Sequence, residues 1–453
     1  MNQNIHIIQK QRYEIKTRKQ KTALDIQNRL EDINTRYVLP VLAEKMDKYF
    51  FSDEVVTIDK LELDIGKINA NFADEDWAKK ILEHLDNQLK QAEAGNKNRK
   101  QQKHKHLVES WTWFLKNGIL PAGIYNSINE IKKDLQTLDE NGKKMLKSFL
   151  FYEADDNAIL RLASTDVEIR KIHLRLLAPE VNIDWMNLII TDAALGLKEK
   201  ISSPAITETY YNQVLWQDIT RHFILNKGKI ISTEDVIRQL KKKTTELSET
   251  GKSNLQNLRS KEEELFEKQI DNLEKLTNAI NDKSARDEGI FISNAGICLL
   301  APWLPSFFKK TGLITENNFA DKWKQQHAIY LLHYLVTNEE YPTEELLIFP
   351  KLLSGWPLQM PVINSYQITE QEKTECEDLL RSIIENWEVL KNTSTKGLQG
   401  SFLQRSGKLI EQDDQFVLQP EQQSIDLLLE YVPWTFRFIL LPWMKKAIQI
   451  DWY

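Results

Sequence analysis

The sequence contains few cysteines and no long hydrophobic run. Its 453 residues include two cysteines, Cys298 and Cys376, so we expect neither a disulfide framework nor a cysteine metal site, and a reducing cytoplasm fits best. The longest apolar stretch near the C-terminus, residues 434–444, contains Arg437 and is shorter than the ~18 residues of a membrane span. The first residues have no basic segment followed by an apolar one, so we expect no export signal.

The sequence also lacks an excess of charge of one sign. The net charge is −6, which predicts neither nucleic acid nor an acidic membrane surface as the main partner. Apolar residues make up 41% of the chain and charged residues 28%, as in folded proteins. Because the chain is longer than one hydrophobic core usually organises, we expect two or three folded units.

Motifs of known catalytic sites are absent as well. There is no glycine-rich phosphate loop, no Gly-x-Ser-x-Gly, no His-Glu-x-x-His and no pair of Cys-x-x-Cys. His327 and His333 are six residues apart, roughly 240° around a helix, so they cannot bind one ion from one face. Two acidic pairs follow that predicted helix and indicate a solvated rim: Glu339 with Glu340, and Glu344 with Glu345. We therefore expect no enzyme, no cofactor and no metal.

The most apolar segment of the chain, residues 291–308, directly follows the most charged one, residues 233–288. The charged segment has one glycine and no proline, and its apolar residues recur every three or four positions, as at Leu255, Leu258, Leu265, Phe266, Ile270, Leu273, Leu276 and Ile280. This pattern predicts a coiled-coil-like helical arm, about 84 Å long if wholly helical. A single amphipathic helix lying on the C-terminal domain is the alternative.

The N-terminal residues alternate between strand and helix patterns. Period-two alternation predicts strands over residues 4–16 and 55–65. Helical spacing predicts helices over residues 17–49 and 74–94, the first of them bent at Pro40. The sequence therefore predicts a β-α-β-α module over residues 1–94.

A basic linker is predicted over residues 95–106, which contain almost no apolar side chain. A nucleic-acid site is a weaker alternative, because no aromatic residue interleaves with the cations Lys97, Arg99, Lys100, Lys103 and Lys105. His104 and His106 are two residues apart, and we interpret them as solvated linker residues rather than metal ligands.

The predicted fold class is α+β and mostly helical. Short amphipathic segments broken by Gly118, Pro121, Pro179 and Pro204 predict a helical middle. The C-terminal part combines predicted helices at residues 296–300, 321–335, 344–353 and 370–387 with a β-hairpin around residues 400–418 and final strands near residues 436–440 and 448–452. The predicted divisions are a module at 1–94, a linker at 95–106, a helical region at 107–230, a charged arm at 231–288 and an α+β domain at 289–453.

Four of the twelve tryptophans lie next to a proline or close to one, namely Trp303, Trp356, Trp434 and Trp443. They could form a face on which a partner docks. A buried aromatic core is the interpretation that we favour, because proline restricts the neighbouring backbone and an indole carries a large apolar surface.

Several short segments, in order along the chain, resemble the tape measure protein family of contractile injection systems, phage-tail-like machines that drive a tube out of a contracting sheath. The C-terminal segments are residues 294–305, 327–335, 351–358, 387–394, 401–409, 432–434 and 441–444, and the N-terminal ones are residues 6–11 and 58–66. The resemblance covers both ends of the chain and leaves the middle unmatched. The family offers no catalytic residues to carry over.

The resemblance implies a structural protein that assembles with tube, baseplate or spike proteins, helps to set tube length, and is assembled into a particle in the cytoplasm. As a ruler, the arm predicts that removing whole heptads between Lys241 and Asn281 shortens the particle. The whole chain as one helix would reach roughly 680 Å, and its prolines exclude that. We therefore favour an assembly factor, with self-association through the arm as a further expectation. A cargo-binding or partner-binding adaptor or plug is the alternative, and a nucleic-acid-binding protein a weaker one.

Overall fold

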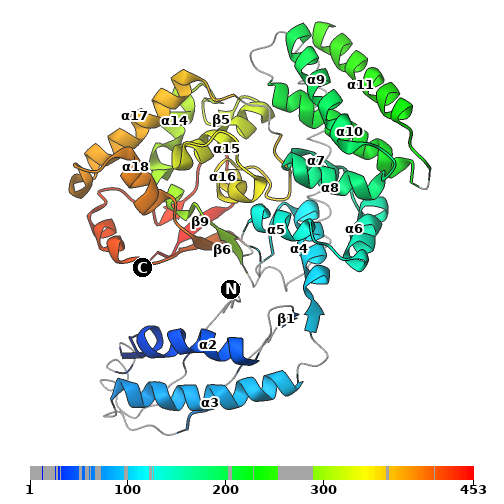
Figure 1. The fold of residues 1–453 in the computed structure, drawn as a ribbon. Coiled ribbons are helices and arrows are strands. Elements are labelled where there is room, and N and C mark those ends of the chain that lie inside the picture. Colours follow the sequence, from blue (N-terminus) through cyan, green and yellow to red (C-terminus); the bar gives the residue numbers. More distant parts are fainter. Residues whose placement is uncertain are drawn as a thin grey trace. The chain divides into compact units, whose positions relative to one another are not determined.

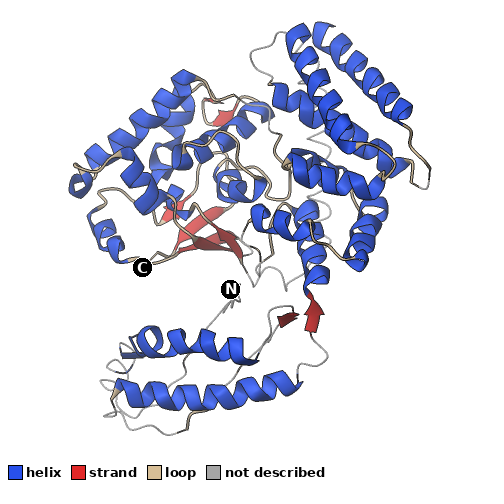
Figure 2. Cartoon of the chain, in the orientation of Figure 1, coloured by secondary structure: helices blue, strands red, loops and turns tan. Residues whose placement is uncertain are grey.

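The computed structural model describes residues 13, 26, 29–30, 32–49, 54–56, 61, 63–66, 73–95, 100–121, 125, 127–201, 207–227, 229–253, 289–363, 367–412 and 414–452. The chain divides into two compact units, residues 1–109 and residues 110–453 (Figure 1). Helices predominate, and strands are concentrated in the C-terminal part (Figure 2). The predicted fold class, α+β and mostly helical, is confirmed. The finer five-part division stays a prediction.

The N-terminal unit is built around two packed helices. Its elements are η1 (Asn34–Val38), α2 (Leu39–Tyr49), β1 (Glu54–Val56), α3 (Asp74–Gly95), β2 (Lys100–Gln102) and the start of α4 (Lys103–Asn117). The buried apolar side chains between η1, α2 and α3 include Ile33, Val38, Leu42, Trp77, Ile81, Leu85 and Leu89. Two ion pairs border this core, Arg29 with Asp74 at 2.7 Å and Lys45 with Asp86 at 2.9 Å.

Two predictions for this unit need correction. The strand predicted over residues 55–65 is too long, because β1 spans three residues, and Leu61 and residues 63–66 are not in a strand. The predicted linker, residues 95–106, contains β2, which pairs antiparallel with β1, and the first turn of α4. Backbone pairing does not require apolar side chains, so composition gave no sign of β2. The strand predicted over residues 4–16 lies outside the described residues apart from Tyr13.

The predicted helical middle is confirmed as a set of short helices. They are α5 (Ile128–Leu135), α6 (Glu140–Tyr152), α7 (Asp156–Ser164), α8 (Val167–Leu177), α9 (Ile183–Ile201) and α10 (Glu208–Leu225). Side-chain oxygens of Ser127, Asp139 and Asp155 accept hydrogen bonds from the first-turn amides of α5, α6 and α7. Helix α10 packs against both α7 and α9 and lies at the centre of this region.

The described part of the predicted arm is α11 (Thr233–Ser253). It packs against α9 and α10, and its buried side chains are Val236, Leu240 and Leu247. The first part of the arm is therefore a packed helix of the helical region, and it does not lie on the C-terminal domain. The apolar seam from Leu255 to Ile280 lies outside the described residues, so the coiled coil stays a prediction.

The C-terminal domain combines short helices with one mixed sheet. The helices are η3 (Ala295–Trp303), α14 (Leu304–Lys310), α15 (Lys322–Thr337), η4 (Glu344–Leu347), α16 (Ile348–Leu353), α17 (Glu370–Asn386), η5 (Glu388–Leu390), α18 (Thr395–Leu398), η6 (Gln399–Leu403) and η7 (Ser424–Tyr431). The strands are β3 (Ile290–Ile292), β4 (Ile314–Thr315), β5 (Asn318–Phe319), β6 (Gly407–Glu411), β7 (Gln415–Pro420), β8 (Phe438–Ile439) and β9 (Ala447–Ile450).

The sheet has the strand order β3-β6-β7-β9-β8, with β7 and β9 parallel and the other neighbours antiparallel. The hairpin predicted around residues 400–418 is β6 with β7, and the predicted final strands are β8 and β9. Alternate residues of β7 and β9, among them Phe416, Leu418 and Ile448, are buried in the domain core. A short separate pair, β4 with β5, completes the β structure that the described residues form.

The apolar segment at residues 291–308 lies in the centre of this core. Helix η3 is buried from Ala295 to Ala301, and α14 adds Leu304, Phe307 and Phe308. These side chains pack with α15, α16 and α17 and with the inner face of the sheet. The segment that is most apolar in the sequence therefore organises the C-terminal domain.

Candidate functional site

All four tryptophans that the sequence singled out lie in the C-terminal domain. Trp356 is 2% exposed, and the other three are half-buried and pack against the domain core. Trp303 and Trp434 meet edge to face, with ring centroids 4.4 Å apart. Trp443 lies against Phe319, with ring centroids 5.0 Å apart. A partner-docking role for these residues stays a prediction.

Three of these indoles are tied to the domain by hydrogen bonds to backbone carbonyls. Trp434 Nε1 donates to the Leu299 carbonyl at 3.1 Å, and Trp443 Nε1 donates to the Leu353 carbonyl at 2.8 Å. Trp356 Nε1 donates to the carbonyl of Met360, four residues further along the chain, at 3.3 Å. The hydrogen bonds of Trp434 and Trp443 thus join the end of the chain to η3 and α16.

The segments that carry the family resemblance pack against one another. A side chain at Gly296 would place its Cβ 1.8 Å from the Phe402 carbonyl oxygen, so η3 approaches η6 as closely as glycine permits. The amide of Ala295 donates to the Arg405 carbonyl at 2.8 Å. These contacts show that the C-terminal segments pack closely together within one domain.

A buried ionic cluster lies where the helical region meets the C-terminal domain, and sequence reasoning did not predict it. Arg161 on α7 has a fully buried side chain. Its Nη1 donates to the carbonyls of Leu115 at 2.8 Å and Lys116 at 2.7 Å, and its Nε donates to Glu344 Oε1 at 3.2 Å. Its Nη2 donates to the carbonyl of Gln359. One guanidinium therefore joins α4, α7 and two segments of the C-terminal domain.

A second buried cation shares the same carboxylate. Lys351 on α16 lies 2.5 Å from Glu344 Oε1 and donates to the Leu358 carbonyl at 3.3 Å. The pKa of Lys351 is lowered to about 8, chiefly by burial, with Glu344 opposing the shift and the neighbouring Arg161 adding to it. An unpaired charge is costly in a desolvated site. Arg161 and Lys351 therefore have to stay paired with the Glu344 carboxylate.

Glu345, the neighbour of Glu344, makes the reciprocal contact to the helical region. Its Oε1 accepts a hydrogen bond from the amide of Ile128, the first residue of α5, at 3.1 Å. Burial raises the pKa of the Glu345 carboxyl. The prediction that Glu344 and Glu345 form a solvated rim is therefore wrong. In the other pair, Glu340 forms an ion pair with Lys373 at 2.7 Å.

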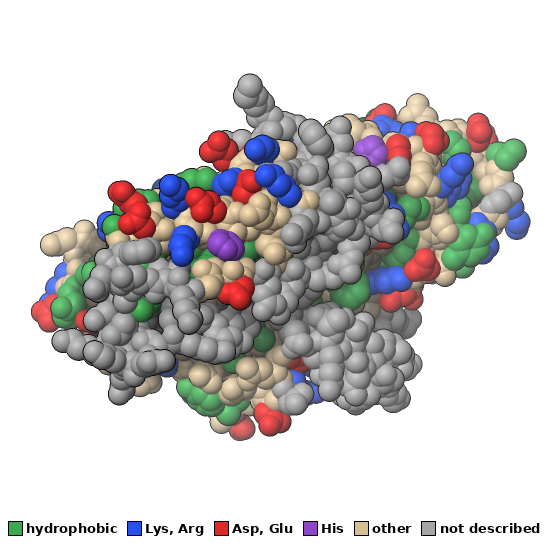
Figure 3. All heavy atoms as spheres, turned by 90° about the horizontal axis from the view of Figure 1, so that it is seen from below, with side chains coloured by type: hydrophobic (Ala, Val, Ile, Leu, Met, Phe, Trp, Pro, Cys, Tyr) green, Lys and Arg blue, Asp and Glu red, His purple; other side chains and the backbone are tan. Residues whose placement is uncertain are grey.

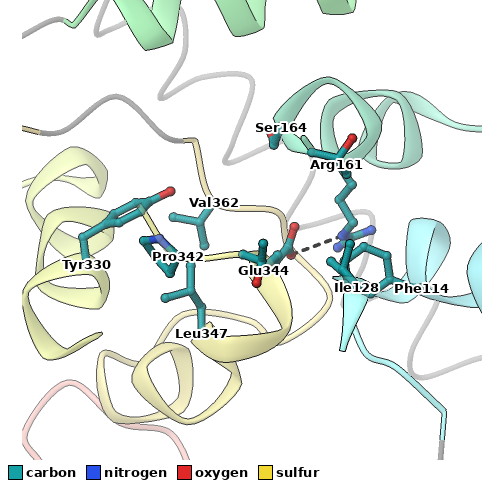
Figure 4. Close-up of a pocket in the computed structure, with 11 residues that line it drawn as sticks. Phe114, Ile128, Arg161, Ser164, Tyr330, Pro342, Glu344, Leu347 and Val362 are labelled. Atoms are coloured by element: carbon teal, nitrogen blue, oxygen red, sulfur yellow. Dashed lines mark hydrogen bonds and ion pairs between the residues drawn. The ribbon is translucent and has the colours of Figure 1, made fainter. Parts of the chain in front are cut away.

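A cavity of about 30 Å³ lies beside the cluster. Figure 4 shows Arg161 and Ser164 reaching it from α7, Tyr330 from α15, and Glu344 and Leu347 from η4. This volume is suited to about one water molecule, whereas sites for small organic ligands measure roughly 300 Å³ or more. The cavity is thus a packing feature of the junction and does not have the size of a substrate site.

Gly118 permits the cluster to form. Its φ of +71° lies in the left-handed region that favours glycine. An added Cβ would lie 2.8 Å from Glu344 Oε1 and 2.9 Å from two nitrogens of Arg161. The sequence marked Gly118 only as a break between helices, because its contact with the ion pair depends on residues far along the chain.

A second buried ion pair closes the C-terminal end of the domain. Arg405 Nη1 lies 3.0 Å from Asp426 Oδ1, and both side chains are almost fully buried. Trp452 Nε1 donates to Asp426 Oδ2 at 3.0 Å, and the Arg405 guanidinium lies 5.5 Å from the Trp452 ring centroid. This pair therefore joins the segment 401–409 to η7 and to the residues after β9.

The two histidines considered as metal ligands, His327 and His333, both lie on α15. His327 lies 3.2 Å from Glu372, and His333 is buried, so the two histidines have different surroundings. Within the described ranges, no three His, Cys, Asp or Glu side chains are grouped as metal ligands. No helix among the described residues has the length and apolarity needed to span a membrane.

Comparison with protein families gives one match over nearly the whole chain. The family model of the contractile injection system tape measure protein matches residues 5–452. The match includes the helical middle, which the sequence segments quoted above left unassigned. Neither the curated proteins nor the solved structures contain a significant match.

Proposed function

The chain belongs to the contractile injection system tape measure protein family, and from this membership we propose that it acts as a structural assembly protein at the junction of tube and baseplate. Its expected partners are tube, baseplate or spike proteins of the same particle. We propose no catalytic step. Assembly of the particle in the cytoplasm is part of this proposal.

The compactness of residues 110–453 supports an assembly role over that of an extended ruler. A ruler works by extension, yet the longest described helix, α3, has 22 residues and spans about 33 Å. Helix α11 packs along α9 and α10, and the ionic cluster around Arg161 joins the helical region to the C-terminal domain. Because the helical region and the C-terminal domain are held together, they can present fixed surfaces to several partners at once.

The experiment is removal of the gene from producing cells, followed by electron microscopy of the particles. We expect sheath and tube to be uncoupled from the baseplate, or particles to be missing, and the full chain supplied in trans to restore them. Normal particles without the gene would refute the assembly role. A loss of cargo from otherwise normal particles would instead favour the adaptor alternative.

A further inference from the structure

Three of the four most exposed large apolar side chains of the described residues lie where α6 and α10 end. Tyr152 is 72% exposed, Leu225 75% and Ile230 85%. Tyr152 is the last residue of α6, Leu225 is the last residue of α10, and Ile230 lies in the turn to α11. Isolated exposed apolar residues are ordinary, but three at adjoining helix ends indicate an interaction surface.

The same place carries three lysines, Lys147, Lys227 and Lys229. The Lys227 ammonium lies 4.1 Å from the Tyr152 ring centroid, which places the turn after α10 against the end of α6. Lys229 follows in the same turn, and Lys147 lies over the Phe151 ring at 5.6 Å. For these three lysines, no ion pair is found within the described ranges. We name Tyr152, Leu225, Lys227, Lys229 and Ile230 together the basic apolar corner.

Two acidic side chains close to the corner, Glu153 and Asp156, already have cationic partners. Glu153 lies 2.7 Å from Lys116, and Asp156 lies 2.7 Å from Arg221. The five corner residues themselves include two lysines and no acid, although the whole chain carries −6. On the face drawn in Figure 3, acidic and basic side chains are interspersed, so a local excess of lysine is not a general property of this surface.

We propose that the basic apolar corner docks an acidic segment with apolar side chains, belonging to another protein of the particle. Aromatic and aliphatic residues form the desolvated centre of protein interfaces, and the lysines at the rim would select acidic partners. A membrane surface fits less well, because polybasic membrane sites usually carry about four to eight cations. Nucleic acid fits less well because bases stack on aromatic rings, and two of the three apolar residues are aliphatic.

The test measures binding of the purified full chain to the purified tube, baseplate and spike proteins of the same particle, one at a time, in low and high salt. We expect one of them to bind, more weakly in high salt, through a segment rich in Asp or Glu. Leu225→Ser and Lys227→Glu should each weaken that binding at least tenfold. Both side chains are exposed, so circular dichroism should show an unchanged fold.

Matched controls come from the same chain. Leu427→Ser removes a leucine that is 72% exposed on η7, and Lys242→Glu makes the same charge change on the exposed side of α11. Neither should change the affinity. The inference is overturned if no component binds, if the corner variants bind like the controls, or if the bound segment is not acidic.

Two further probes decide between partner classes. Vesicles of phosphatidylserine with phosphatidylcholine, and double-stranded DNA, should not retain the chain through the corner. If vesicles or DNA retain the chain and Lys227→Glu abolishes that retention, the partner is lipid or nucleic acid and not a protein. The choice of partners rests on the proposed function, but the proposed function and the docking site can be refuted independently. Normal particles without the gene reject the function, whereas unaltered binding by both corner variants rejects only the corner.

Discussion

Arg161 is the residue on which the junction between the helical region and the C-terminal domain depends most. Arg161→Met would leave Glu344 with Lys351 alone and leave the carbonyls of Leu115 and Lys116 without this donor. Removing one partner of a buried ion pair costs about 3–5 kcal/mol of the free energy of unfolding. Urea unfolding of the full chain measures this loss.

The matched control is Arg221→Met, because Arg221 also pairs with one carboxylate, Asp156, but is 37% exposed. Exposed pairs contribute about 1 kcal/mol or less, so this variant should unfold close to the wild-type urea concentration. Equal losses for the two variants would show that the buried cluster does not hold the junction.

Gly118 allows a comparison between two glycines of similar backbone conformation. Gly118 has φ +71° and Gly312 has φ +70°, but only at Gly118 would an added Cβ meet other atoms within 4 Å. Alanine at either position carries the strain of a positive φ. Gly118→Ala should lose roughly 1–3 kcal/mol more than Gly312→Ala, because it also overpacks the ion pair. Thermal unfolding of the two variants checks the difference, and equal values would contradict the contact.

Among the helices, α4 and α8 are joined by a buried hydrogen bond between two rings. Trp111 Nε1 donates to His173 Nε2 at 2.7 Å, and His173 Nδ1 donates to the Ile169 carbonyl at 2.7 Å. Burial lowers the pKa of His173 from 6.5 to about 4. The folded state thus requires the neutral ring, whose Nε2 accepts from tryptophan.

This contact predicts a loss of stability in acid. Well above pH 6.5 the ring is neutral in both states. As the pH falls from 6.5 to about 4, only the unfolded state takes up the proton, so the free energy of unfolding decreases by about 3 kcal/mol in all. His173→Gln keeps an acceptor without titrating and should lack this part of the decrease. Urea unfolding at pH 7.5, 6, 5 and 4 compares the two proteins, and parallel curves would contradict the prediction.

At the scale of the whole molecule, the length of chain between α11 and β3 leads to a prediction about particle length. The structure describes α11 as far as Ser253, and β3 begins at Ile290, so a helix over residues 254–288 would add only about 50 Å. Removing one or two heptads within residues 255–281 leaves the packed residues Val236 and Leu240 in place. We expect particles of normal length by electron microscopy. Tubes shortened by about 10 Å per heptad would support the ruler instead.

Much of the fold could be predicted because it depends on patterns within single segments. The spacing of apolar residues predicted α3, α15 and α17, and Asp321 and Thr369 cap the last two with hydrogen bonds to first-turn amides. The hairpin β6–β7 followed from alternation on both sides of a short polar turn. The candidate site could not be predicted, because Arg161 and Glu344 are far apart along the chain.

The sequence by itself determined the fold class, the family and the central place of residues 291–308, because each depends on local order or composition. Only the tertiary structure decided which polar residues are buried. From the sequence we expected a solvated rim at Glu344 and Glu345 and a linker at Lys100–Gln102. Each interpretation failed for the same physical reason: burial and backbone pairing are set by partners that folding brings from distant parts of the chain.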